Sequence, residues 1–425
     1  SNVYCYNGAI VAGDVYGAGY GNGANVTGNT NVRIHSNINY DGTGTRATKM
    51  TEIRGNIFGG GRSAPVGGNT VVNINDAKAN RNVFGGGKSA VVSGDTDVDI
   101  INSRVLEDVY GGGDEAAVSG ESTIDIDSSI IEESVYGGGN KGALGSNVTD
   151  KDSALIKIYN NSNVAVVYGG GASAAVNGKI YIDVDNSTIN AVYGAGEGEA
   201  SNVTQSTELD IANSTIEKVY GGGLSGDIAG NIVIGVRECQ INDSIYGAGY
   251  GSAAVSSGDT QMSVVDSNVT NNLYGGGDSG EVRGSASVYV TASTVGENIY
   301  GGGNNAAVLG STDIKFLEDS IVNVVFGGGN NGNVGSSTSV NILERSRVRD
   351  TVYGGGNNGT VGGFTSVKVD DSSIENVLFG GGKGYTATVQ GTNVILQNFS
   401  TVAYIYGGGD QGEVKGGSPS ETNVI

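Results

Sequence analysis

Acidic residues recur at alternate positions of one repeated segment, a spacing that could hold carboxylates on neighbouring coils. In residues 96–100, Thr-Asp-Val-Asp-Ile, the polar positions are Asp97 and Asp99. Later copies carry acids there too, with Lys157 interrupting: Asp125, Asp127, Asp183, Asp185 and Asp210. Stacked carboxylates repel one another, and a hard cation such as Ca²⁺ would relieve the repulsion. The spacing predicts a metal site among Asp99, Asp125, Asp183 and Asp185; the alternative is a solvated acidic face without an ion.

A second candidate is an aromatic residue that follows an aliphatic one and precedes Gly-Gly-Gly. It occurs fifteen times, as Tyr16, Phe58, Phe84, Tyr110, Tyr136, Tyr168, Tyr193, Tyr220, Tyr246, Tyr274, Tyr300, Phe326, Tyr353, Phe379 and Tyr406. The middle glycine is replaced by Ala18, Ala195 and Ala248. The residue two before the ring is usually polar, so strand alternation predicts that the ring faces outward.

An outward ladder of rings beside flat glycines could bind glycans. The candidate ligand-binding residues are Tyr110, Tyr136, Tyr168, Tyr193, Tyr220 and Tyr246. The alternative is structural, because stacked rings would stabilise one another and shield the neighbouring glycines.

The spacing of these copies indicates the architecture that positions both candidates. Most copies are 25 to 28 residues apart, with exceptions of 42 and 32. A fixed period of this length predicts a solenoid, in which stacked repeats form one body rather than separate domains. We therefore expect one continuous domain over 1–425, with partial coils at 1–14 and 410–425 and insertions near 39–56 and 146–150.

Each repeat contains short alternating segments separated by turns rich in Asn, Asp and Gly. Alternation indicates strands, and no repeat has apolar residues at helical spacing. The sequence predicts an all-β, single-stranded, right-handed parallel β-helix of about 14 to 15 coils, right-handed because parallel crossovers almost always are. Thr96, Val98 and Ile100 should face inward.

A serine recurs just after this strand and should form a ladder at an inside corner. Its members are Ser36, Ser103, Ser128, Ser162, Ser187, Ser214, Ser267, Ser293, Ser320, Ser346, Ser372 and Ser400. Ala77 and Cys239 fill the two gaps. Only small residues occupy this position, so we expect Cys239 to be a buried thiol, not bonded to Cys5.

Several functions are excluded by composition or by failed motifs. A net charge of −21 argues against a nucleic-acid partner, which needs a basic surface. No apolar run is long enough to span a membrane. His35 is the only histidine, which rules out sites built on histidine clusters. The segment Phe84–Ser89 ends in Gly-Lys-Ser but lacks the first glycine of a phosphate loop, and no nine-residue calcium-binding repeat is present.

The repeat Val-Tyr-Gly-Gly-Gly followed by Val-x-Gly-x-Thr-x-Val-x-Ile resembles the glycine-rich parallel β-helix repeats of bacterial cell-surface proteins and adhesins. The resemblance covers nearly the whole chain and implies an extracellular, non-catalytic part of a longer protein that binds glycan, host or matrix. It transfers no catalytic residue. The alternative is a β-helix polysaccharide lyase or hydrolase that uses the acidic strip, with Ca²⁺ as a cofactor. Ice binding and a phage fibre are further alternatives; an inward Thr ladder disfavours the former.

Overall fold

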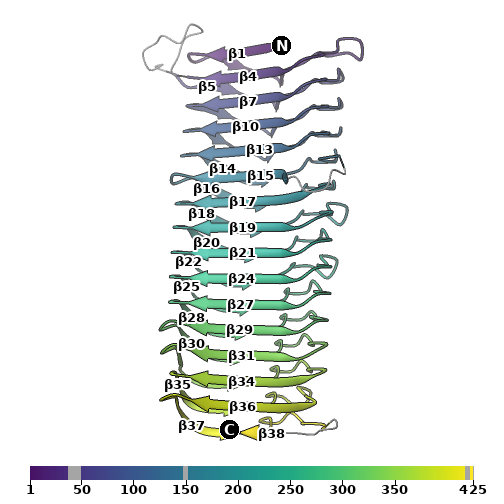
Figure 1. The fold of residues 1–425 in the computed structure, drawn as a ribbon. Coiled ribbons are helices and arrows are strands. Elements are labelled where there is room, and N and C mark those ends of the chain that lie inside the picture. Colours follow the sequence, from purple (N-terminus) through teal and green to yellow (C-terminus); the bar gives the residue numbers. More distant parts are fainter. Residues whose placement is uncertain (37–48, 147–151, 417–421, 425) are drawn as a thin grey trace. The chain divides into compact units, whose positions relative to one another are not determined.

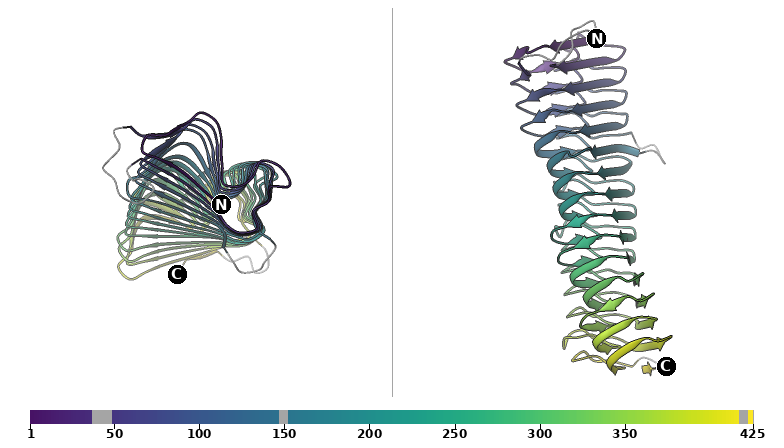
Figure 2. Two further views of the ribbon diagram at one scale, coloured as in Figure 1. Left: turned by 90° about the horizontal axis from the view of Figure 1, so that it is seen from above. Right: turned by 90° about the vertical axis from the view of Figure 1, so that its left-hand side faces the viewer.

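The computed structural model describes residues 1–36, 49–146, 152–416 and 422–424 (Figure 1). These residues form strands, turns and isolated bridges, with no helix among them. The chain divides into two compact units, 1–210 and 211–425, which are described separately. In each unit, parallel strands stack coil upon coil as a β-solenoid, and successive coils have a similar outline that turns gradually along the stack (Figure 2). The predicted fold class is confirmed, with about 15 turns in all.

In the first unit, every coil contributes one strand to the first sheet, called here a long strand, and one or two strands to the second sheet. The long strands are β1 (Asn2–Tyr6), β4 (Thr30–His35), β7 (Thr70–Asn75), β10 (Thr96–Ile101), β13 (Ser122–Asp127), β15 (Asp152–Tyr159) and β17 (Lys179–Asp185). The others are β2 (Ile10–Val11), β3 (Val15–Tyr16), β5 (Thr51–Ile53), β6 (Ile57–Phe58), β8 (Ala77–Ala79), β9 (Val83–Phe84), β11 (Arg104–Val105), β12 (Val109–Tyr110), β14 (Ile130–Tyr136), β16 (Asn163–Tyr168) and β18 (Thr188–Tyr193).

The second unit repeats the pattern, and β19 (Thr207–Ala212) includes the boundary between the units. Its long strands are β21 (Ile232–Arg237), β24 (Thr260–Val265), β27 (Ala286–Thr291), β29 (Thr312–Leu317), β31 (Thr338–Leu343), β34 (Phe364–Asp370), β36 (Gly391–Gln397) and β38 (Thr422–Val424). The others are β20 (Thr215–Tyr220), β22 (Gln240–Ile241), β23 (Ile245–Tyr246), β25 (Asn268–Val269), β26 (Leu273–Tyr274), β28 (Thr294–Tyr300), β30 (Ile321–Phe326), β32 (Arg347–Val348), β33 (Thr351–Tyr353), β35 (Ser373–Phe379) and β37 (Thr401–Tyr406).

The long strands stack in register, apart from a shift at the start of β15 against β17, so equivalent residues form straight rows. In β10, Thr96 is opposite Thr70 in β7 and Ser122 in β13. Thr96, Val98 and Ile100 are buried while the residues between them are partly exposed, which confirms the predicted alternation. Single-residue bridges such as Val92↔Val118 close another side of the coil.

Most buried threonines of the long strands bond across the interior to the glycine segment, although the buried Thr207 hydroxyl has no partner. Thr96 donates its hydroxyl to the carbonyl of Gly111 at 2.6 Å, and Thr312 bonds in the same way to Gly327 at 2.6 Å. The acceptor is the first glycine of the following coil's Gly-Gly-Gly. Each bond satisfies a hydroxyl that burial would otherwise leave unpaired, and it links successive coils from the inside.

This close approach explains why the position after the ring is glycine. A Cβ added to Gly85 would lie 2.4 Å from the Gly111 carbonyl oxygen and 2.9 Å from Thr96 Cβ. Neither the backbone nor the buried threonine can give way without breaking the bond between them. The glycines therefore allow the strand end and the threonine row to meet inside the coil.

The serine ladder is confirmed except at Ser36, whose place opposite Ala77 is taken by Thr51, and at Ser128. Ser103 N–H donates to Ser129 Oγ at 3.0 Å, and Ser129 donates its hydroxyl to the Asp127 carbonyl at 2.7 Å. Ser129 is thus the buried ladder residue, and the predicted Ser128 was wrong because it takes a left-handed turn, with φ of 51°. Cys239 is a buried thiol outside any disulfide, as expected, and its N–H donates to Ser267 Oγ at 3.0 Å.

The first insertion is shorter than predicted. Residues 37–48 lie outside the described part, but Thr51–Ile53 form strand β5 in register with Ala77–Ala79 of β8. The end of the predicted 39–56 insertion therefore belongs to the regular coil. Ala77, which is opposite Thr51 in the next coil, has no hydroxyl to accept the Thr51 N–H. Ser36 Oγ accepts this N–H instead, at 2.7 Å. Of the insertion near 146–150, only Ser146 is described.

The residue before the ladder serine adopts a left-handed conformation in most coils. Asn and Asp predominate there, as expected for residues that tolerate positive φ, but the second unit places Ala292 there with φ of 49°. An alanine in this conformation costs roughly 1–2 kcal/mol.

We therefore expect Ala292→Gly to raise the free energy of unfolding by about 1 kcal/mol, since glycine relieves this strain but loses more entropy on folding. Urea denaturation would measure the change. Ala307→Gly, on a neighbouring turn without positive φ, is the matched control and should not stabilise. Equal effects of the two substitutions would contradict the explanation.

Candidate ligand-binding surfaces

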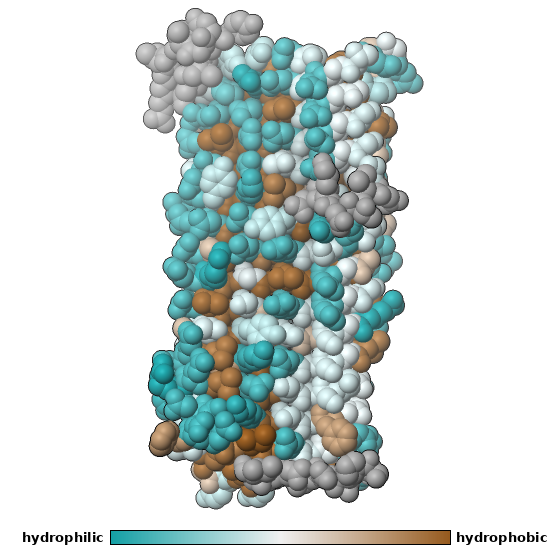
Figure 3. Space-filling view, in the orientation of Figure 1, coloured by the Kyte–Doolittle hydropathy of each residue, from teal (hydrophilic) through white to brown (hydrophobic). Residues whose placement is uncertain are grey.

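The outward face of the long strands carries the predicted acidic residues. Strand register places Asn73, Asp99, Asp125, Lys157 and Asp183 in one row, on consecutive coils. Hydrophilic side chains cover this face, with apolar ones interspersed among them (Figure 3). Its chemistry therefore depends on which charges are neighbours along the row.

Three carboxylates of this face converge. Oxygen atoms of Asp97, Asp99 and Asp125 lie within 4.8 Å of one another. Asn73 donates from its side-chain amide to Asp99 at 3.1 Å, and the Lys157 ammonium lies 3.9 Å from Asp125. The oxygen donors are of the kind that Ca²⁺ prefers, but that ion takes six to eight ligands, so most of its shell would be water.

Asp183 and Asp185 are not part of this cluster. In the row, Lys157 stands between Asp125 and Asp183 and so separates the two pairs of predicted metal residues. Asp183 and Asp185 instead line a hollow of about 250 Å³ with Lys157, Tyr159 and Asn160. The structure therefore brings together Asp99 and Asp125 of the predicted set and adds Asp97.

Burial and mutual repulsion raise the pKa of two members of the cluster, Asp97 and Asp125. Partial burial, and then the charges of Asp99 and Asp125, raise the pKa of Asp97 to about 6. Burial also raises the pKa of Asp125, while the Lys157 ammonium opposes the rise. Because the folded state holds the Asp97 proton more tightly than the unfolded state, folding stability falls as pH rises from about 4 to about 6.

Asp97→Asn should therefore raise the melting temperature at pH 7 and flatten its decline between pH 4 and pH 6. The substitution removes the repelled charge but keeps the size of the side chain. Thermal melts across this pH range measure it, with Glu115→Gln, on an exposed turn outside the cluster, as the control. A pH slope that is identical in the wild type and the Asp97 variant would contradict the assignment.

The aromatic residues form face-to-face stacks, as predicted. In the first unit, ring centroids from Tyr16 to Tyr193 are 4.7–5.0 Å apart. In the second, from Tyr220 to Tyr406, they are 4.7–5.1 Å apart. The Tyr110 hydroxyl donates to Asp108, two residues earlier, at 3.1 Å, so the ring lies on the same side of the strand as that polar residue.

The prediction that these rings form an open binding strip is wrong, because they are covered. Tyr110, Tyr136, Tyr168 and Tyr220 are 3–7% exposed, and Tyr193 and Tyr246 are only partly exposed. Neighbouring rings cover the faces, and side chains from the turn after Gly-Gly-Gly approach the edges. Glu197, for example, accepts the Tyr136 hydroxyl at 2.8 Å.

This enclosure affects the tyrosine hydroxyls as well. Burial, followed by nearby carboxylates, raises the pKa of Tyr246 to about 12 and those of Tyr110 and Tyr136 further still. The hydroxyls therefore remain protonated, and most of each ring is inaccessible. Four of the six candidate glycan-binding residues of the sequence analysis are therefore buried, and the other two, Tyr193 and Tyr246, are partly exposed.

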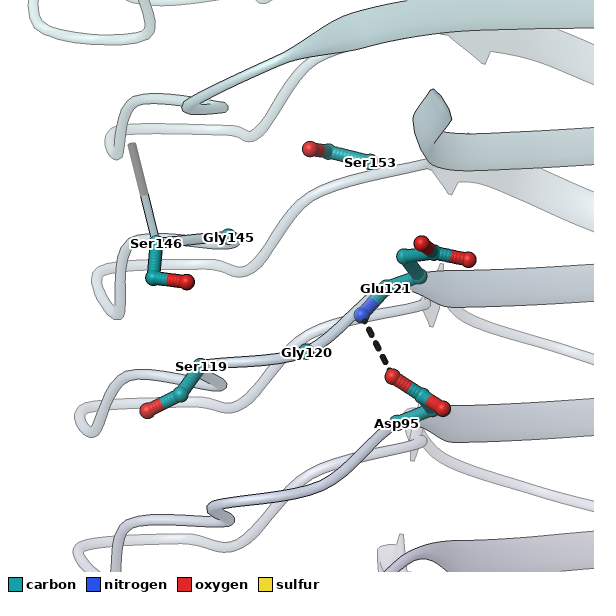
Figure 4. A pocket seen from close by; sticks show the side chains of 7 residues that line it. All are labelled: Asp95, Ser119, Gly120, Glu121, Gly145, Ser146 and Ser153. Carbon is teal, nitrogen blue, oxygen red and sulfur yellow. Dashed lines mark hydrogen bonds between the residues drawn. The ribbon is translucent and has the colours of Figure 1, made fainter. Parts of the chain in front are cut away.

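A polar hollow of about 220 Å³ lies where the turns of the first unit enter the long strands (Figure 4). Asp95, Glu121, Ser119, Ser146 and Ser153 line it together with two glycines. Asp95 Oδ1 accepts the Glu121 N–H at 3.0 Å, and the Ser153 hydroxyl donates to the Asn177 carbonyl at 3.0 Å. Asp95 is thus used in linking coils, which leaves a small hydroxyl- and carboxylate-lined surface for ligands.

Exposed aromatic rings occur elsewhere, on turns that depart from the common pattern. Tyr20, Tyr250 and Tyr385 are 73%, 45% and 80% exposed. Their coils have longer turns: the bridging residue follows the ring by eight positions in Tyr110–Val118 but by ten in Tyr246–Ser256. This two-residue difference is visible in the sequence and would have identified the accessible tyrosines.

No family model, curated protein or solved structure matches the chain. Among the described residues, no helix is long and apolar enough to cross a membrane.

Proposed function

We propose that the chain is an extracellular, non-catalytic surface protein of the adhesin type, which binds glycan, host or matrix through a repeated surface. The observation that carries the proposal is the repetition of outward polar groups from coil to coil. Asn69 Oδ1 accepts the Asp95 N–H at 3.0 Å, and Asp95 repeats this bond to Glu121. Such rows present the same chemistry at each coil on a rigid backbone, so weak contacts can add along the stack.

A binding screen tests this function. The purified chain would be applied to a glycan array and to immobilised matrix proteins. We expect saturable binding without any change to the ligand. A heat-unfolded sample is the control for non-specific adsorption, and absence of binding to every glycan, cell surface and matrix component would overturn the proposal.

The cluster of Asp97, Asp99 and Asp125 supports a second candidate, a polysaccharide lyase or hydrolase. A carboxyl group with a pKa of about 6 can exchange a proton near neutral pH, which general acid–base catalysis requires. Ca²⁺ bound beside it would neutralise the adjacent carboxylates and hold an acidic sugar.

Depolymerisation assays on acidic and neutral polysaccharides, with and without Ca²⁺, distinguish the two functions. Turnover that is abolished by Asp97→Asn or Asp125→Asn would favour the enzyme. Binding that persists in both variants, without product formation, would favour the adhesin.

A further inference from the structure

The second unit carries a short row of side-chain amides on the exposed side of its turns. The amide row comprises Asn305, Asn331 and Asn358, at the second position after Gly-Gly-Gly in three successive coils. Asn331 Nδ2 donates to Asn305 Oδ1 at 3.1 Å, and Asn358 Nδ2 donates to Asn331 Oδ1 at 3.1 Å. All three residues are exposed.

The backbone under the amide row is hydrogen bonded from coil to coil. Asn331 N–H donates to the Asn304 carbonyl and Asn358 N–H to the Asn330 carbonyl, each at 2.7 Å. On the neighbouring row, the side chains of Asn304, Asn330 and Asn357 are bonded one to the next at 2.8 Å. The exposed amides therefore have fixed positions and orientations, and binding a ligand to them costs little ordering.

Each amide has hydrogen-bonding capacity beyond the row. A primary amide has two N–H donors and two acceptor lone pairs, and the bond to a neighbour uses one of each in the central residue Asn331. A donor and an acceptor per coil suit a sugar hydroxyl, which both accepts and donates. The row carries no charge, and the net charge of −21 would repel an acidic ligand.

An exposed ring follows the end of the amide row. Gly384 continues the row after Asn358: its N–H donates to the Asn357 carbonyl at 2.7 Å, and an added Cβ would lie 2.6 Å from Asn358 Oδ1. Thr386 donates its hydroxyl to the Asn358 carbonyl at 2.7 Å. Tyr385, between them, is 80% exposed. An open tyrosine ring offers an apolar face on which the C–H groups of a sugar can stack.

We infer that Asn305, Asn331, Asn358 and Tyr385 form a binding site for a neutral, extended, β-linked polysaccharide that runs along the coil stack. Ring centroids of these coils are 4.9–5.1 Å apart, which gives the repeat of the amides. An extended β-1,4-linked pyranose chain advances by a similar distance per sugar, so successive sugars meet successive amides. The inference rests on the proposed glycan-binding function and specifies its ligand class.

Calorimetry of the full chain with oligosaccharides tests the site. Cellohexaose is the extended probe, and maltohexaose, with the same sugar but a curved α-linked chain, is its geometric control. We expect binding of cellohexaose alone, with affinity that rises with chain length up to about four sugars, one for each amide and one for the ring.

Substitutions locate the binding. Tyr385→Ala and Asn331→Asp should each weaken cellohexaose binding by about tenfold or more without lowering the melting temperature. Tyr20→Ala removes a comparably exposed ring from the first unit and should change nothing. Undiminished binding by the Tyr385 variant, or equal binding of maltohexaose, would overturn the site.

The outcomes also separate the site from the wider function. Binding of another glycan or of matrix, with no binding of cellohexaose, overturns this inference but leaves the proposed function intact. Absence of all binding overturns both. Thermal hysteresis in freezing solutions without cellohexaose binding would assign the amide row to ice instead and would also overturn the inference.

Discussion

Gly85→Ala is expected to destabilise the first unit by more than about 3 kcal/mol. The added methyl would overlap the Gly111 carbonyl oxygen at 2.4 Å and Thr96 Cβ at 2.9 Å, two groups that hydrogen bond to each other through the Thr96 hydroxyl. Relief would require the two coils to separate, which breaks that bond and opens the buried row. Urea denaturation, together with hydrogen exchange at the Gly85 N–H, measures the loss.

Gly28→Ala is the matched control for this prediction. It is in the same unit, and an added Cβ there meets no atom within 4 Å. Its stability should change by less than about 0.5 kcal/mol, as is usual for surface positions. Equal stability of Gly85→Ala and Gly28→Ala would contradict this explanation. The close approach to the threonine row would then not be what requires glycine after the ring.

Phe326→Ala is expected to cost the second unit about 3–5 kcal/mol, the usual range for removing a buried phenylalanine. Phe326 is 3% exposed and stacks between Tyr300 and Tyr353, with centroids 4.9 Å away on both sides. Truncation leaves a gap that rigid strands cannot close. Faster hydrogen exchange at the N–H groups of Gly301 and Gly327, which flank the gap, would accompany the loss.

Phe326→Tyr is the control for this prediction, because it changes the residue but keeps an aromatic ring in the stack. Both neighbours are tyrosines at the equivalent position, so the hydroxyl should be accommodated at a cost below about 1 kcal/mol. Because repeat proteins can lose coils in steps, the exchange measurement is needed beside the denaturation curve. A Phe326→Ala variant as stable as Phe326→Tyr would show that stacking contributes little.

The features that could be predicted from the sequence follow from alternation within one strand and from the constant length of the repeat. The alternation of Thr96, Val98 and Ile100 follows from a period of two, and the stacking of rings follows from equal spacing between coils. Ser129 was missed because two adjacent serines compete for the ladder position, and the choice between them depends on which one the turn forces into positive φ.

The binding surface was less predictable because exposure depends on neighbouring coils. Alternation predicted that Tyr136 faces outward, yet the residue is only 5% exposed and Glu197, on a later turn, accepts its hydroxyl. The grouping of Asp97 with Asp99 and Asp125 likewise required the register between strands. Tyr385 was recognisable only as a departure from the common turn length.

The bond from an inner threonine to the first glycine of the following coil has a consequence for how the gene that encodes this protein can change in length. Removing residues 327–353 would join Phe326 to Gly354, so that Thr312 would face the carbonyl that had accepted the hydroxyl of the removed Thr338. Where the inner residue is threonine in two successive coils, as at Thr312 and Thr338, loss or duplication of one period restores this bond. Unequal recombination can therefore lengthen or shorten this protein in steps of one coil, while insertions of other lengths must leave the stack as loops.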